Sequence, residues 1–459
     1  MTLLTNALSG AVAAQTALNT TSQNIANVMT EGYTRQGVML RSVQPSRSGS
    51  TAAGDGVAVP SLFRFSDSYK NLQLWQSNST LGQTSVAQPY LTQLEQVMGD
   101  DTASIADGLD KFFNALNAAS VEPTSSPLRD SVINAADALA QRFNSLRQTL
   151  SSQQQALSQQ RKDLVSQTNT YAADIANLNQ RIAEAQATGV NASGLVDERD
   201  QKIDKLASLV GVQVVTQPDG SANVSLKGGQ PLVVGHQAST LAVTTLADGS
   251  QQMSLTFASE TFALGSTPLD GQLGGLDTVE QTQLKPMVQS LQDMASGLAT
   301  GVNGVLSAGY AMDGSAGRPL FVIDTTSASS LLTIDHSLKA ADLGFSGSAT
   351  EPGNSDQLQA LIALKSQPVS ITGLGNVLLG DVYTQLVGKL GMASQANQTA
   401  MTTAQTVRDQ ADANWKSTSG VNEDEEAVNL MQYQQMYNAN MKVITVANEL
   451  FDAMLQMVG

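Results

Sequence analysis

The residue types best suited to catalysis are scarce in this sequence of 459 residues. There are two histidines, His236 and His336, and no cysteines. A thiol nucleophile, a disulfide and a Cys-ligated zinc or iron–sulfur site are therefore excluded, and so is a metal site built from several histidines. A Ser-His-Asp triad would have to use one of these two isolated histidines, for which a structural role is the simpler interpretation.

Four other patterns could carry chemistry, and none fits a known site. Gly373-Leu374-Gly375 followed by Gly380 misses the spacing of a dinucleotide loop, and Gly388-Lys389 lacks the serine or threonine of a phosphate loop. The carboxylates of Glu423–Glu426 point in different directions on a helix, which disfavours a metal site. Asp197–Asp200 alternates in charge, which predicts a solvent-exposed helix face. We expect no catalytic, metal or cofactor site and predict that the chain is not an enzyme.

Composition limits the partners and the destination of the chain. Its 24 basic and 40 acidic side chains give a net charge of −16, which opposes binding to nucleic acid or to an anionic membrane surface. No stretch of about 20 apolar residues could cross a membrane. The first charged residue is Glu31 and the first basic one is Arg35, so a cleavable signal is not expected. The protein is expected to be cytoplasmic or exported with an uncleaved N-terminus.

Both ends of the chain carry an apolar repeat of seven residues, which is typical of helices that pair as coiled coils. Ala7, Ala14 and Thr21, the companion positions near the N-terminus, are small and would let a partner helix approach closely. We expect these ends to be frayed in the single chain and to become ordered when copies stack. The residues predicted to form the contact between helices during assembly are Leu4, Leu8, Ala11, Leu18, Ile25, Leu430, Tyr437, Met441, Ile444, Phe451 and Leu455.

The middle of the chain changes its period twice. Residues 66–210 have a helical pattern that includes a seven-residue repeat from Phe143 to Leu178, which predicts a helix of over forty residues. From Gly211 to Ser266 apolar residues alternate with polar ones, and turn signals at Pro218-Asp219-Gly220 and Ala247-Asp248-Gly249 separate the predicted strands. Helical patterns return after residue 275, with short strands near 321–323 and 331–334.

The predicted fold is mainly α with a β insertion. It comprises paired terminal coiled-coil helices, a core domain formed by a bundle of long helices, and a small antiparallel β outer domain. We expect residues 1–41 and 417–459 to form the terminal helical domain. Residues 42–210 and 267–416 would form the helical core domain, and residues 211–266 the outer domain.

Several segments resemble a known family. The N-terminal stretch Leu8-Ser9-Gly10 to Gln36 resembles the signature of bacterial flagellar rod, hook and hook-associated proteins. Its signature residues are Asn24, Ile25, Ala26, Asn27, Gly32, Tyr33, Arg35 and Gln36. The C-terminal block Ser419–Ala427 with Tyr433-Gln434-Gln435 is similar to the hook-associated protein 1 branch of that family, as are Phe112–Leu116, Leu195–Asp200 and Gly314–Phe321. Larger members carry an additional outer domain after this last loop, so the chain resembles a short form.

The resemblance implies a structural component of the bacterial flagellum that acts as an adaptor at the hook–filament junction. It further implies unfolded export through the flagellar type III apparatus, assembly at the hook tip, and an extracellular location. The implied partners are other copies of the chain in a ring-like assembly, hook subunits, neighbouring junction or filament proteins, and an export chaperone on the C-terminal helix. The alternatives are another axial flagellar subunit (hook, distal rod or filament type), a secreted surface protein such as a hydrolase, and a cytoplasmic coiled-coil scaffold.

Overall fold

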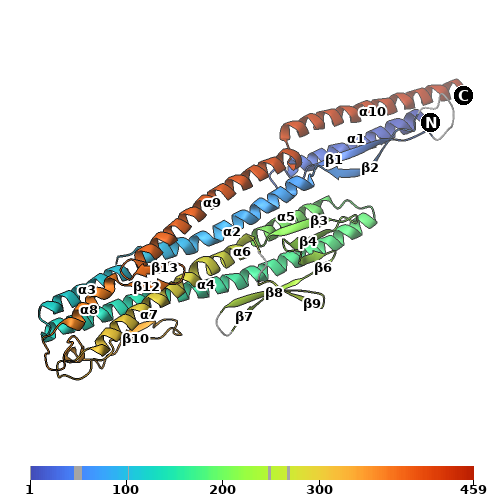
Figure 1. Ribbon diagram of the computed structural model, residues 1–459. Helices are drawn as coiled ribbons and strands as arrows, with labels where there is room; N and C mark the ends of the chain where they lie inside the picture. Colours follow the sequence, from blue (N-terminus) through green and yellow to red (C-terminus); the bar gives the residue numbers. More distant parts are fainter. Residues whose placement is uncertain (1, 46–53, 102, 247–249, 266–268, 459) are drawn as a thin grey trace. The chain divides into compact units, whose positions relative to one another are not determined.

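The computed structural model describes residues 2–45, 54–101, 103–246, 250–265 and 269–458 (Figure 1). The chain divides into two compact units. Unit 1 is drawn from residues 1–81, 165–271 and 404–459, and unit 2 from residues 82–164 and 272–403. The long helices α2 (Ser68–Met98), α4 (Ser126–Ala187) and α9 (Val382–Ser419) contribute residues to both units. The predicted mainly α fold with small antiparallel sheets is confirmed.

Unit 1 contains both ends of the chain. Helices α1 (Thr2–Ala26) and α10 (Glu423–Val458) lie side by side, and the strands β1 (Gln36–Ser42) and β2 (Val57–Arg64) form an antiparallel hairpin next to α1 (Figure 1). The side chain of Asn422 accepts hydrogen bonds from the first backbone amides of α10, so the start of this helix is capped as its sequence predicts. Helix α5 (Ser193–Leu209) completes the helical part of this unit.

The β insertion of unit 1 comprises two separate sheets. The first contains β3 (Val212–Thr216), β4 (Ala222–Leu226), β5 (Pro231–Val234) and β6 (Gln237–Ala238), in that order. The second contains β7 (Thr240–Thr245), β8 (Gln251–Phe257) and β9 (Glu260–Ala263). All described pairings are antiparallel. The predicted turn at Gly220 is present, with a positive φ of 78°, whereas the predicted turn at 247–249 lies outside the described residues.

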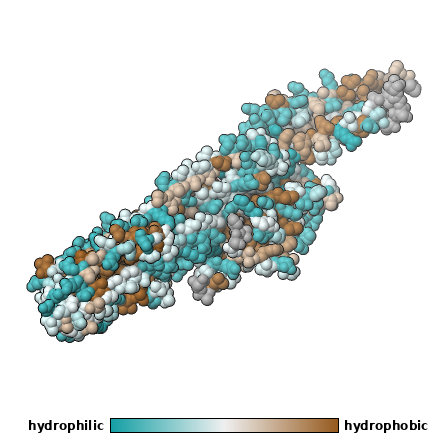
Figure 2. Space-filling view, viewed as in Figure 1, coloured by the Kyte–Doolittle hydropathy of each residue, from teal (hydrophilic) through white to brown (hydrophobic). Residues whose placement is uncertain are grey.

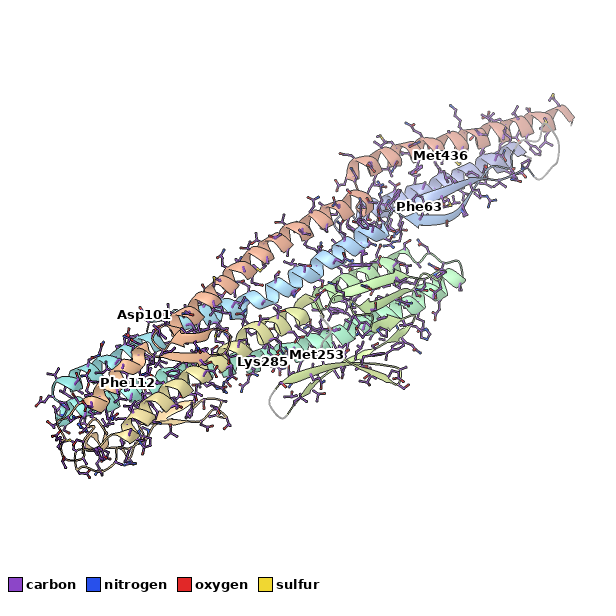
Figure 3. All side chains as sticks on the ribbon, viewed as in Figure 1. Phe63, Asp101, Phe112, Met253, Lys285 and Met436 are labelled. Carbon is purple, nitrogen blue, oxygen red and sulfur yellow. The ribbon has the colours of Figure 1, made fainter. Side chains whose placement is uncertain are left out.

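Unit 2 is built mainly from helices. It includes α3 (Ile105–Val121), most of α6 (Gly271–Val279), a π-helical turn at Glu280–Leu284, α7 (Lys285–Ala308) and α8 (Asp356–Ala363). Its two small hairpins pair β10 (Phe321–Ile323) with β11 (Leu332–Ile334), and β12 (Pro368–Ile371) with β13 (Gly375–Leu378). Phe112, marked in Figure 3, packs edge-on against Phe113 and Phe321 in the core of this unit.

Two local features of unit 2 follow from single residues. The glycines that resemble part of a nucleotide loop form the turn between β12 and β13, where Gly373 and Gly375 have φ values of 80° and 79°. The π-helical turn directly precedes Pro286, which has no amide hydrogen to donate to the preceding turn. The wider turn lets the helix continue past this proline.

Asparagines on the long helices dock the sheets onto them. In each case the asparagine side chain donates a hydrogen bond to the backbone carbonyl of a strand residue and accepts one from the backbone amide of the same residue. A neighbouring strand would make the same two hydrogen bonds. Asn169 does this with Leu241, and Asn144 does it with Leu332. Asn179 binds Ala222 in both directions and also donates to the carbonyl of Gly235. Strands in both units are thereby fixed to α4 by polar contacts.

Replacing Asn179 by alanine is expected to destabilise the first sheet by about 2–4 kcal/mol, because three buried backbone groups lose their partner. Asn179 is 1% exposed. Hydrogen exchange measured by mass spectrometry should show faster exchange in β4 and β5. The same change at Asn134, an exposed residue of α4, is the matched control. Equal exchange in the two variants would contradict the docking role.

Candidate functional site

The two ends of the chain pair as an antiparallel helical hairpin. Asn24 near the end of α1 donates a hydrogen bond to Glu426 at the start of α10, across 402 residues of sequence. Farther along, a Cβ atom on Gly10 would lie 2.5 Å from Oδ1 of Asn440, so the two backbones approach closely there. Both segments are helical in the single chain. The expected fraying is therefore absent from this structure, and over the paired length each helix supplies the other with a partner.

The buried face of α1 is made almost entirely of small side chains. This agrees with the prediction that the small companion positions would allow close approach of a partner helix. The buried residues are Ala7, Gly10, Ala11, Ala13, Ala14, Ala17, Thr20, Thr21 and Asn24. On α10 the residues that are buried or half-buried are Glu426, Asn429, Tyr433, Met436, Tyr437, Asn440, Ile444 and Ala447.

The structure separates the predicted contact residues into two groups. Ala11 is buried in the pairing face, and Leu18, Tyr437 and Ile444 are half-buried. The others lie on the solvent-exposed surface of the two helices: Leu4, Leu8, Ile25, Leu430, Met441, Phe451 and Leu455. Within one chain, therefore, most of the large predicted residues keep a substantial part of their side chains exposed to solvent. Their part in contacts between chains stays a prediction.

Three signature residues, Asn24, Tyr33 and Gln36, form a polar cluster with Glu426 where α1, the hairpin and α10 meet. Asn24 is 1% exposed and uses its whole side-chain amide. It donates to the carbonyl of Gln36 and to Glu426, and it accepts from the hydroxyl of Tyr33 at 2.8 Å and from the amide of Gln36 at 3.0 Å. Because a buried amide must satisfy its hydrogen bonds, this arrangement fixes the direction of the chain as it leaves α1.

Arg35 ties the same region to the start of α10. Its guanidinium pairs with Glu425 and lies 4.1 Å from the ring centre of Phe65. Its backbone amide donates to the carbonyl of Ser419 at 2.8 Å. The signature residues Ile25 and Ala26 are instead exposed, while Asn27 donates to the carbonyl of Gln23.

The turn at Gly32 has a structural reason to contain glycine. Its φ is 72°, and a Cβ atom there would lie 2.4 Å from Nε2 of Gln201. Gln201 in turn donates a hydrogen bond to the carbonyl of Glu31. The turn is therefore held against α5, and a larger residue at position 32 would push the two apart.

Burial and neighbouring carboxylates raise the pKa of Tyr33 to about 12, with Asp197 and Glu426 as the contributing charges. Replacing Tyr33 by phenylalanine is expected to cost about 1 kcal/mol, since one buried hydrogen bond to Asn24 is lost. The raised pKa gives stability that is complete below about pH 10, the usual tyrosine value, and is lost as the pH rises toward 12.

Ultraviolet absorbance of the phenolates tests this prediction. Burial also raises the pKa of Tyr383 to about 12 and raises the pKa of Tyr90 above its usual value, so three tyrosines should titrate late in the unchanged chain. The Tyr33 variant should show one late tyrosine fewer, whereas Tyr69→Phe, at a residue that is 69% exposed, should leave the number of late tyrosines unchanged. An unchanged late titration in the Tyr33 variant would contradict the assignment.

The prediction for Asp197–Asp200 is wrong at two of its four residues. Asp197 and Arg199 are buried, at 6% and 4% exposure. Asp197 accepts from the amide of Thr34 at 3.3 Å and pairs with Arg64, which connects α5 to the hairpin. Burial raises the pKa of Asp197, and Arg64 and Thr34 act against that rise. Helix α5 packs inside unit 1, and this buries two charges of the run.

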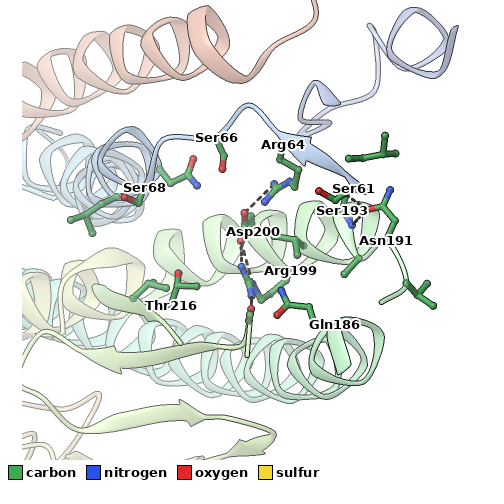
Figure 4. Close-up of a pocket in the computed structure, with 18 of the residues that line it drawn as sticks. Ser61, Arg64, Ser66, Ser68, Gln186, Asn191, Ser193, Arg199, Asp200 and Thr216 are labelled. Carbon is green, nitrogen blue, oxygen red and sulfur yellow. Dashed lines mark hydrogen bonds and ion pairs between the residues drawn. The ribbon is translucent and has the colours of Figure 1, made fainter. Parts of the chain in front are cut away.

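A cleft of about 1060 Å³ borders this ion network (Figure 4). Arg64 and Arg199 both approach Asp200 there, and Arg199 also donates to the carbonyl of Gly220 at 2.6 Å. Ser193 at the start of α5 donates to the side chain of Asn191. Each charged group named here is paired with another group of the described chain, so these charges hold the walls of the cleft together.

The histidines and the C-terminal acidic run have the following surroundings in the described residues. His236 and His336 are both exposed, and Glu426 is bound by Asn24 within the signature cluster. No group of three or more potential metal ligands lies together among the described residues. No helix in the described part of the chain has an apolar segment long enough to cross a membrane. What the site does show is a paired helical end with an exposed apolar surface.

Comparison with known proteins identifies related chains along the whole sequence. Residues 91–321 match the helical domain of the flagellar hook-associated protein FlgK. Residues 4–34 match the flagella basal body rod protein family, and residues 417–457 match the C-terminal region of the flagellar basal body rod proteins FlgEFG. The terminal matches coincide with α1 and α10, and the central one begins in α2 and ends at the start of β10.

Individual relatives agree. Flagellar hook-associated protein 1 of Salmonella typhimurium is 27% identical, with 99% of each chain covered. The protein of that name from Bacillus subtilis is 28% identical, with 97% of this chain and 96% of the relative covered. The Salmonella alignment extends over 550 positions, so this chain lacks segments that the relative has, as expected for a short form.

A solved structure shows the same fold. The flagellar hook junction protein FlgK from Burkholderia pseudomallei superposes with a TM-score of 0.68 at 17% identity, covering 76% of this chain and all of that one. Because the helical-domain match covers half of the sequence and both terminal helices match flagellar rod families, the chain belongs to the flagellar hook-associated protein 1 (FlgK) family of structural flagellar proteins.

Proposed function

We propose that this chain is an adaptor at the hook–filament junction, assembled at the hook tip after unfolded export through the type III apparatus. The observation that carries the proposal is the apolar surface that α1 and α10 leave exposed after they have paired. Figure 2 shows apolar side chains gathered toward the free ends of these helices. The exposed residues include Leu3, Leu4, Leu8, Val12, Met431, Met441, Val446, Leu450, Phe451, Met454, Leu455 and Met457.

Within the described residues, the far end of α10 extends beyond its partner helix α1. Because α1 and α10 run antiparallel with Asn24 beside Glu426 and Gly10 beside Asn440, the first described residues of α1 lie near residue 448 of α10. The remaining turns of α10, about three, extend past α1. Their side chains at Phe451 and Leu455 are 59% and 58% exposed. A helix end this apolar favours burial against other subunits.

The proposed arrangement places residues 1–41 and 417–459 in the inner layer of the assembly. The helical core at 42–210 and 267–416 would form the next layer, and the β domain at 211–266 would face outward. The partners would be other copies in a ring-like assembly, hook subunits and neighbouring junction or filament proteins. Before export, a chaperone would cover the exposed apolar stripe of α10. The family membership supports a flagellar location, and the extracellular placement follows from the proposed assembly site.

Electron microscopy with gold labelling tests the location. A small epitope inserted at Gly228, in the exposed turn between β4 and β5, should be labelled as one spot where hook meets filament. Label along the whole hook, rod or filament would instead identify a subunit of that segment. Absence of label from flagella, with the epitope shown to be accessible on purified protein, would contradict a flagellar role. An unrelated epitope sequence at the same site is the control for the antibody.

A further inference from the structure

Methionine is the only sulfur-containing residue of this chain. The sequence has 15 methionines and no cysteine, so a peroxide that reaches the protein meets thioethers and no competing thiol. The methionines that are buried, at no more than 6% exposure, are Met98, Met253, Met287 and Met294. Because their sulfur atoms are shielded from solvent, oxidation of the folded chain is directed to the exposed methionines.

More than half of the exposed methionines in the described residues lie on the last helix. Those of α10 are Met431, Met441, Met454 and Met457, and those elsewhere are Met29, Met39 and Met392. Met454 and Met457 lie in the part of α10 that extends past α1, whereas Met431 and Met441 lie farther back on the helix. We call residues 449–457, the part beyond α1, the overhang.

Met454 and Met457 complete an exposed apolar stripe on α10. Val446, Leu450, Met454 and Met457 follow one another at spacings of four, four and three residues, which places their side chains on one face of the helix. All four are exposed in the single chain, Met457 by 80%. The stripe does not coincide with the seven-residue repeat that includes Phe451, so the overhang has a second apolar face.

A thioether on this face has a defined reaction with hydrogen peroxide. The sulfur lone pair attacks one peroxide oxygen, the O–O bond breaks, an S–O bond forms, and the other oxygen leaves as water. Sulfur loses two electrons and peroxide gains them. The product, methionine sulfoxide, is polar, and a reductase returns it to methionine by oxidising two thiols to a disulfide and releasing water. The reaction therefore makes two positions of an apolar stripe reversibly polar.

We propose that Met454 and Met457 form a reversible oxidation site that controls assembly, so that a chain with sulfoxides in its overhang stays folded but does not join the flagellum. In the single chain the sulfoxides are solvated, and α10 keeps its helix. In the assembly the stripe would be covered by neighbouring subunits, and a polar group without a hydrogen-bond partner is costly to bury. The inference rests on the proposed function and adds regulation to the same surface.

Peptide mass spectrometry of the purified, peroxide-treated chain tests the site itself. Met454 and Met457 should be oxidised at least about tenfold faster than Met98 and Met294, which are 2% and 0% exposed. Circular dichroism should be unchanged, and methionine sulfoxide reductase with a thiol reductant should restore the original mass. Equal rates at exposed and buried methionines, or loss of helix on oxidation, would overturn the proposal.

Regrowth of flagella in dilute hydrogen peroxide tests the consequence for assembly. Cells that make the chain are sheared and regrow flagella with or without peroxide, and immunoblots measure the amount of chain per hook. Peroxide should lower the amount of the unmodified chain about tenfold or more. Met454→Leu combined with Met457→Leu keeps the volume and apolar character of both side chains but removes the sulfur. This variant should be retained equally in both conditions.

Two further variants make the test specific. The matched control is Met29→Leu with Met392→Leu, which removes two thioethers outside α10 that are 92% and 71% exposed. It should stay as sensitive to peroxide as the unmodified chain. Met454→Gln with Met457→Gln imitates the polarity of the sulfoxides and should be depleted from flagella without any peroxide. Protection by the control pair, or normal retention of the glutamine variant, would overturn the regulatory role.

The two levels of the proposal fail differently. If the unmodified chain is present in flagella grown without peroxide, and peroxide depletes it and the leucine variant of the overhang equally, only the oxidation inference is wrong. If the unmodified chain is absent from flagella even without peroxide, the proposed function is wrong and its regulation is wrong with it.

Discussion

Phe451→Asp is expected to leave the chain folded in solution and to lower its incorporation into flagella at least a hundredfold. Phe451 is 59% exposed and lies on the part of α10 that extends beyond α1, so an aspartate there stays solvated in the single chain. In the assembly the same position would be covered by apolar neighbours, and burying an unpaired carboxylate costs several kcal/mol. Circular dichroism of the purified chain and immunoblots of sheared flagella measure the two effects.

The control for this variant is Met392→Asp, which adds the same charge at a 71% exposed apolar residue of α9 that belongs to unit 2. It should incorporate normally. Loss of helix in the Phe451 variant would mean that the end of α10 is already packed in the single chain. Normal incorporation of that variant would show that this surface stays exposed in the flagellum.

Arg161→Met is expected to destabilise unit 2 by about 3–5 kcal/mol, because it leaves two carboxylates without their shared cation. Arg161 is 1% exposed and lies on α4. It pairs with Asp277 at 2.9 Å and with Glu280 at 2.5 Å, at the point where α6 passes into the π-helical turn. Burial raises the pKa of Asp277 even beside this arginine, although its side chain is 37% exposed. Hydrogen exchange across α6 and α7 measures the loss.

Two further variants distinguish lost charge balance from lost packing. Arg181→Met removes an exposed arginine of the same helix and should change stability by less than about 0.5 kcal/mol. Adding Asp277→Asn and Glu280→Gln to the Arg161 variant should recover much of the loss, because the buried charges are then gone. If this triple variant is as unstable as Arg161→Met, packing rather than charge explains the effect.

The terminal helices and the small residues of the α1 contact were predictable from sequence, but the outward position of most of the large residues in the repeat was not. A seven-residue repeat defines a helix whichever stripe is buried, and here Leu4 and Leu8 lie outward while Ala7, Ala11 and Ala14 lie inward. The stripe of small residues is the buried one, because small side chains let two helix backbones approach closely, as at Gly10. The sequence contains no measure of how near the partner will come, so periodicity alone cannot choose between the stripes.

Contacts between distant segments explain the other differences. From its sequence, the charged run at Asp197 was predicted to be exposed to solvent. In the structure Asp197 contacts Arg64 and Thr34, which lie more than a hundred positions away in the sequence. The signature cluster was found by resemblance, yet its mechanism, a single asparagine binding Tyr33, Gln36 and Glu426, depends on partners that only the fold brings together. The local sequence pattern predicts helices and strands. Whether a charged residue on them is buried or exposed depends on contacts with distant segments of the chain.

Pairing the first helix with the last also sets an order of events for the chain. Asn24 is synthesised early, but its partner Glu426 is made 402 residues later, so α1 cannot find its neighbour until nearly all of the polypeptide is available. Closing so long a loop is slow compared with forming local helices. The two ends should therefore be the last part of the chain to fold. A chain truncated anywhere before α10 should leave α1 without its partner helix, even if the rest has folded.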